Sequence, residues 1–131
     1  MSPYIFLLDI EGLSLLFRNS KEPRTITGVC FVGTINLNHL IFLDDVLMFG
    51  NGSVEEWCSF CAIISLFCEA YGLDVSEEKS IFIFANVDEG ERYPFVIVLD
   101  FKMVDFLVGF KYLIFFLKLV GYTLKDWEWL L

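Results

Sequence analysis

The stretch Ile41-Phe42-Leu43-Asp44-Asp45-Val46-Leu47-Met48-Phe49 sets two adjacent carboxylates inside a run that is otherwise apolar. Burying an ionised group without a partner costs roughly several kcal/mol, so the aspartates lie at an exposed tip, beside cations, or both. β-Branched and aromatic residues favour strands over 35–42 and 46–49, joined by a tight turn at 43–45. We therefore predict an antiparallel hairpin with the aspartates at its tip, a layout that can present them to divalent metal ions.

Helix signals flank this hairpin on both sides. Ser2-Pro3 is a capping hydroxyl followed by proline, and it predicts a helix from Tyr4 to about Phe17. A strand over 27–32 precedes the hairpin. After the hairpin, Ser53-Val54-Glu55-Glu56 forms a capping box that predicts a helix to about Tyr71, ended by Gly72.

The C-terminal half carries weaker signals. A polar loop is predicted at 76–79, followed by a short strand over Ser80–Phe84. The charged segment 86–93 favours a loop or a short helix, 95–99 is ambiguous, and Phe110–Leu117 is typical of a strand. We predict an α+β fold, with an antiparallel sheet built on the aspartate hairpin and the helices that begin at Ser2 and Ser53 packed on one face.

The length and composition predict one domain with more apolar residues than its own core needs. The 131 residues are 56% hydrophobic and include 15 Phe, which is more than a self-contained soluble domain of this size usually carries. We expect no membrane span, because charges interrupt the apolar stretch 94–122. These charges are Asp100, Lys102, Asp105, Lys111 and Lys118. The N-terminus lacks the basic segment of a signal peptide, and we expect an intracellular protein.

The net charge and the spacing of the cysteines bear on nucleic-acid binding and on metal binding. The net charge of −9 argues against nucleic-acid binding, which depends on Lys and Arg. Cys58, Cys61 and Cys68 fall near one face of the predicted second helix, so thiols packed in the core are favoured over a zinc site. His39, the single histidine, is expected to be structural.

Taken in order, four blocks of the chain resemble the palm domain of a reverse transcriptase from plant-type, LINE-like retrotransposons without long terminal repeats. Ser2–Ser14 is similar to the end of the template-contacting loop and the helix that follows it, and 39–47 resembles the catalytic aspartate hairpin. Leu66–Ser80 resembles the helix, glycine and lysine block that comes next, with Ser76 where the family usually has asparagine. Gly109–Ile114 is similar to the hairpin that grips the primer, although the family has glycine where Ile114 stands.

The resemblance implies an RNA-directed DNA polymerase that uses two Mg²⁺ ions for nucleotidyl transfer on an RNA template and a DNA primer. It makes Asp44 and Asp45 the metal ligands and places Lys79 near the leaving phosphates. Tyr112 and Leu113 would belong to the primer grip. Ser2 and Pro3 would be a remnant of the template loop. Nuclear and cytoplasmic locations both fit this family.

The resemblance also implies missing parts. The family needs a third carboxylate from an upstream strand, together with fingers and thumb segments, so we expect this partial palm, over 1–131, to be inactive in isolation. A truncated or decayed copy of a mobile-element polymerase would account for the surplus of apolar residues.

Other interpretations of the sequence remain. Aspartates favour turns for structural reasons, and Lys79 alone is typical of a solvated loop. The chain is alternatively a non-enzymatic protein-interaction module or a remnant with no activity. A third alternative is membrane association through 95–120, which the embedded charges disfavour.

Overall fold

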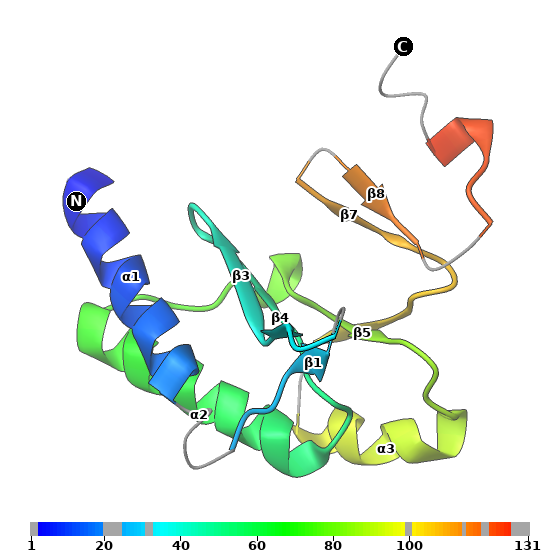
Figure 1. Cartoon of the computed structure of the whole chain (residues 1–131), viewed down its shortest axis with the longest axis horizontal. Helices are drawn as coiled ribbons and strands as arrows, with labels where there is room; N and C mark the ends of the chain where they lie inside the picture. Colours follow the sequence, from blue (N-terminus) through cyan, green and yellow to red (C-terminus); the bar gives the residue numbers. More distant parts are fainter. Residues whose placement is uncertain are drawn as a thin grey trace. The chain divides into compact units, whose positions relative to one another are not determined.

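The computed structural model describes residues 3–19, 25–30, 33–98, 101–113, 115–118 and 121–126. The chain divides into two compact units, 1–74 and 75–131, where the sequence predicted one domain. Figure 1 labels the helices and strands of both units. Both are mixtures of helices and short strands, so the broad α+β prediction is confirmed.

Among its described residues, the first unit has two helices and two antiparallel strand pairs. Its elements are α1 (Pro3–Asn19), β1 (Val29–Cys30), β2 (Asn36–Leu37), β3 (His39–Phe42), β4 (Asp45–Met48) and α2 (Val54–Tyr71). Strands β1 and β2 pair antiparallel, as do β3 and β4. The prediction of one sheet built on the aspartate hairpin is wrong for the described residues, whose strands form four separate two-stranded sheets.

Both ends of α2 follow from local sequence. The Ser53 hydroxyl accepts a hydrogen bond from the Glu56 backbone N–H at 3.3 Å. At the other end, Gly72 takes the left-handed conformation with φ of 64°, which glycine adopts at no steric cost. The predicted start and end of this helix are therefore confirmed. The predicted first helix is also confirmed, beginning at Pro3, whereas Ser2 lies outside the described residues.

The two helices enclose the core of the first unit beneath the hairpin. Leu13 and Phe17 of α1 meet Phe60 and Phe67 of α2, together with Ile26. The rings of Phe17 and Phe60 contact edge to face at 5.6 Å between centroids. Strands β3 and β4 pack against this cluster through Ile41, Val46 and Met48. The aspartate hairpin is thus fixed to the helices through its apolar side chains.

The second unit contains a β-α-β crossover and a further hairpin. Its elements are η1 (Glu77–Lys79), β5 (Ile81–Phe84), α3 (Glu89–Val98), β6 (Lys102–Asp105), β7 (Phe110–Tyr112) and β8 (Phe115–Leu117). Strands β5 and β6 pair in parallel, joined through α3. Three phenylalanines, Phe82, Phe84 and Phe95, form its buried aromatic cluster, with ring centroids 4.8 to 5.6 Å apart.

Several predictions for the second unit need correction. The single strand predicted over Phe110–Leu117 is wrong, because β7 and β8 form an antiparallel hairpin with Tyr112 opposite Phe115. Leu113, in its turn, has φ of 54°, and Ile114 lies outside the described residues. The loop predicted at 76–79 contains a 3-10 turn. One helix, α3, covers most of both segments left open at 86–99, even though Pro94 removes a backbone donor inside it.

The membrane alternative concerned 95–120. Within the described part of that segment, the chain forms the end of α3 and short strands. Among the described residues, no helix combines the length and the apolar character needed to cross a membrane.

Candidate functional site

The aspartates lie at the tip of the β3–β4 hairpin, as predicted. Phe42 pairs with Asp45, so the connecting turn has two residues, Leu43 and Asp44. Leu43 has φ of 53°, the positive value that primed hairpin turns require at their first central residue. Asp45 is therefore the first residue of β4 and lies outside the turn, which corrects the three-residue tip by one position. Both aspartates are exposed.

The contacts of the two carboxylates can be stated for the described residues. Within the described ranges, neither aspartate forms an ion pair. In the same ranges no group of three or more His, Cys, Asp or Glu side chains is arranged to hold a metal ion. Carboxylate oxygens suit Mg²⁺, but two carboxylates supply few of the six ligands that it prefers. The described residues therefore fit a metal site only in part.

Other residues implied by the resemblance belong to the second unit. Lys79 ends η1 and is exposed. Tyr112 ends β7, and Leu113 follows it in the turn toward β8. Among the described residues of the first unit, Asp44 and Asp45 lie next to each other at the hairpin tip. Pro3, expected as part of a template-loop remnant, is the exposed first residue of α1.

Glu56 makes hydrogen bonds that differ from those that the capping-box pattern predicts. That pattern has the carboxylate accept from the N–H of the cap residue. Instead, Glu56, only 3% exposed, accepts from Thr27 N at 2.6 Å, Thr27 Oγ1 at 3.0 Å and Gly28 N at 2.9 Å through Oε1. Its Oε2 accepts from Asn51 N at 2.5 Å. One carboxylate therefore ties both ends of the segment that contains the hairpin to the start of α2.

The N–H of Ser53, which a capping box assigns to that glutamate, donates to Asn51 Oδ1 at 2.9 Å instead. Asn51 also donates through Nδ2 to Thr27 Oγ1 at 2.9 Å. Asn51 thus accepts the hydrogen bond from the Ser53 N–H that a capping box assigns to Glu56. The Glu56 carboxylate can therefore bind Thr27 and Gly28.

A second polar chain joins α1 to β3. Asn38 Nδ2 donates to the Phe17 carbonyl at 3.1 Å, His39 Nδ1 lies 2.6 Å from Asn38 Oδ1, and His39 Nε2 lies 2.9 Å from Ser14 Oγ. The Phe17 and His39 rings are 5.0 Å apart between centroids. His39 is therefore held by polar contacts on both ring nitrogens, one of them to a serine 25 residues away that no sequence pattern indicated.

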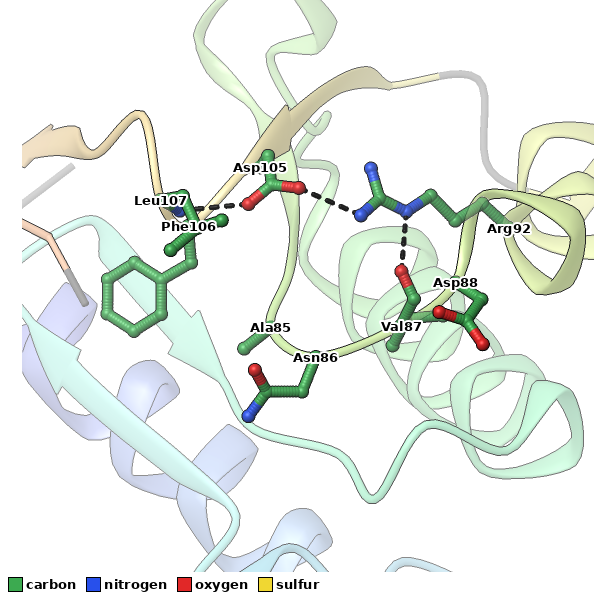
Figure 2. A pocket seen from close by; sticks show the side chains of 8 residues that line it. All are labelled: Ala85, Asn86, Val87, Asp88, Arg92, Asp105, Phe106 and Leu107. Carbon is green, nitrogen blue, oxygen red and sulfur yellow. Dashed lines mark hydrogen bonds and ion pairs between the residues drawn. The ribbon is translucent and has the colours of Figure 1, made fainter. Parts of the chain in front are cut away.

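The second unit has a polar hollow of about 360 Å³ beside the carboxyl ends of β5 and β6. Figure 2 shows the Arg92 guanidinium between Asp105 and the Val87 carbonyl. It donates to Asp105 Oδ2 at 2.8 Å and to Val87 O at 3.0 Å, and it lies 5.1 Å from the Phe84 ring centroid. The Leu107 N–H bond to Asp105, followed by Arg92, lowers the pKa of the Asp105 carboxyl. This pair fixes α3 to β6.

The cysteines pack only in part as predicted. Cys58 is exposed, so the prediction of a core thiol is wrong for this residue. Cys61 and Cys68 are half-buried, and Cys68 packs against the core cluster. The buried residues of α2 are instead Glu56, Phe60 and Phe67. Aromatic side chains occupy these core positions because they bury more apolar area than a thiol does. Burial raises the pKa of both Cys61 and Cys68.

No protein-family model matches the chain, and no curated protein or solved structure is significantly similar to it. The resemblance to a reverse transcriptase palm therefore rests on the four sequence blocks and stays a prediction.

Proposed function

We propose that the first unit carries the metal-ligating aspartate hairpin of an RNA-directed DNA polymerase of the plant-type retrotransposon kind. The observation that supports this most is the hairpin itself. Its apolar strands are packed on the core through Ile41 and Val46, while Asp44 and Asp45 stand exposed at its tip. Metal-dependent nucleotidyl transfer needs this combination of a rigid support and free carboxylate oxygens.

In such a polymerase, bound Mg²⁺ ions activate the primer hydroxyl and stabilise the leaving pyrophosphate. The role of this chain is to hold the ligands. Asp44 would be the main metal ligand, and Asp45 would complete the acidic pair from the first position of β4. Lys79 would screen charge on the phosphates. A third carboxylate would come from outside the described residues, so the chain alone would bind metal weakly and would not polymerise.

A titration with Mn²⁺, followed by electron paramagnetic resonance, tests the proposal. The unaltered chain is expected to bind Mn²⁺ weakly, and Asp44→Asn to weaken that binding about tenfold or more. Asp74→Asn is the matched control, because Asp74 is an exposed aspartate of the same unit. Equal binding by the two variants, or no binding by the unaltered chain, would refute the proposal.

A protein-interaction module is the second candidate, and the surface of α1 favours it. Tyr4 is 79% exposed and Leu8 72%, and three further apolar side chains of this helix, Ile5, Leu7 and Leu15, are exposed as well. Exposed apolar side chains gathered on one element are typical of a surface that a partner covers. This candidate predicts that Mn²⁺ binding does not depend on Asp44.

A further inference from the structure

We propose that Ser14 is a nucleophile activated by His39, and that it attacks small, neutral, apolar carboxylic esters bound in the hollow between α1 and β3. The proposal uses none of the residues assigned to metal, phosphate or primer binding, so it stands or falls independently of the proposed function. Its basis is a chain of three side chains. The Ser14 hydroxyl lies within hydrogen-bond reach of the His39 imidazole, and the imidazole lies within reach of the Asn38 amide.

The hydrogen bonds of Asn38 determine the state of the imidazole. Because Asn38 Nδ2 donates to the Phe17 carbonyl, its Oδ1 is the atom that faces His39 Nδ1. An amide oxygen can only accept, so the proton of the neutral ring sits on Nδ1. Nε2 is then left as the acceptor for the Ser14 hydroxyl at 2.9 Å. This is the arrangement of a general base held by an amide, as in cysteine proteases that use a Cys-His-Asn triad.

The Ser14 hydroxyl is committed to this base. A serine inside a helix often donates to the carbonyl four residues earlier. Ser59 of α2 does so, with its Oγ 3.0 Å from the Glu55 carbonyl. In the part of the chain described by the structure, Ser14 Oγ has His39 as its hydrogen-bond partner instead. The contact between the Phe17 and His39 rings helps to hold the imidazole in place.

Both reacting groups reach a cavity. Ser14 is 8% exposed, yet it and His39 line a hollow of about 310 Å³. The hollow is open, and its lining residues Leu7, Leu40 and Leu43 are themselves exposed. Apolar side chains supply most of the remaining lining, namely Leu7, Ile10, Leu40, Ile41 and Leu43. Glu11 is the charged residue of the lining. Apolar walls and a carboxylate together favour a ligand that is apolar and carries no negative charge.

The reaction balances without a further reactant. Ser14 Oγ forms a bond to the ester carbonyl carbon while its proton passes to His39 Nε2. The bond from that carbon to the alkoxy oxygen then breaks, and the proton on Nε2 passes to the departing alkoxide. The products are an acylated Ser14 and an alcohol.

Diisopropyl fluorophosphate, a small, neutral and apolar electrophile, is the probe. Attack by Ser14 would form an Oγ–P bond and release fluoride, and His39 would take the proton. We expect one phosphoryl group per folded chain, located on Ser14 by peptide mass spectrometry. A general base contributes typically 10²–10⁴-fold, so His39→Gln is expected to slow labelling about 100-fold.

Three comparisons make the outcome decisive. Ser14→Ala is expected to abolish labelling, and Ser59→Ala, the matched control, to leave it unchanged. Because His39→Gln removes a packed ring, the unaltered chain is also labelled in guanidinium chloride, where unfolding should stop the reaction at Ser14. Absence of labelling in the folded chain, or labelling of Ser14 that is equally fast after unfolding, would overturn the proposal.

Discussion

Replacing Glu56 by glutamine tests whether one buried carboxylate holds the segment that contains the aspartate hairpin. The glutamine oxygen can still accept from Thr27 and Gly28, but the amide nitrogen then faces the Asn51 N–H. One charge-assisted hydrogen bond is lost, worth about 1.5–3 kcal/mol, and the others become neutral and weaker. We expect the free energy of unfolding of the first unit to fall by about 3 kcal/mol.

Glu55→Gln is the matched control. Glu55 also lies in the first turn of α2 but is exposed, so both variants lose the same favourable charge near the helix N-terminus. The control is expected to change stability by less than about 0.5 kcal/mol. Urea unfolding followed by tryptophan fluorescence measures both, because Trp57 packs against the core of this unit. Equal midpoints for the two variants would refute the role assigned to Glu56.

Three further changes test other parts of the structure. Leu43→Gly should stabilise the first unit by up to about 1 kcal/mol in urea unfolding, because a left-handed conformation costs leucine roughly 1–2 kcal/mol and glycine gives back part of this as entropy. Iodoacetamide should alkylate exposed Cys58 faster than Cys61, whose pKa is raised by burial, and the reverse order in peptide mass spectrometry would contradict this. The contacts that lower the pKa of Asp105 stabilise the second unit at pH values above about 3.9, the pKa of this carboxyl in the unfolded chain. This contribution is lost as pH falls through the lower pKa of the folded state. Asp105→Asn should therefore reduce stability at pH 7, and its difference from the unaltered chain should shrink as pH falls below about 3.9, unlike that of the exposed control Asp88→Asn.

The features predicted from sequence are those set by neighbouring residues. The cap at Ser53, the left-handed Gly72 and the hairpin around Asp44 each depend on a few adjacent positions, and each was found within one residue of the prediction. The turn was predicted one residue too long because aspartate is common in turns, whereas Asp45 pairs with Phe42 as the first residue of β4.

Features that depend on distant residues were missed. The parallel pairing of β5 with β6 depends on α3, whose Pro94 weakens the helix signal. Glu56 reaches back 29 residues to Thr27, and no local pattern specifies that contact. Cys58 was predicted in the core but is exposed, because the larger side chains of Phe60 and Phe67 occupy the fully buried positions of α2.

Primer extension on an RNA template with Mg²⁺ tests the central claim most directly. The chain would be joined at its N-terminus to the fingers and first aspartate strand of a plant-type retrotransposon reverse transcriptase, and compared with the chain alone. The account predicts that only the joined protein extends the primer, and that Asp44→Asn abolishes extension. A joined protein that folds and binds the primer and template but does not extend it, or one that still extends with Asp44→Asn, would contradict the assignment of the hairpin.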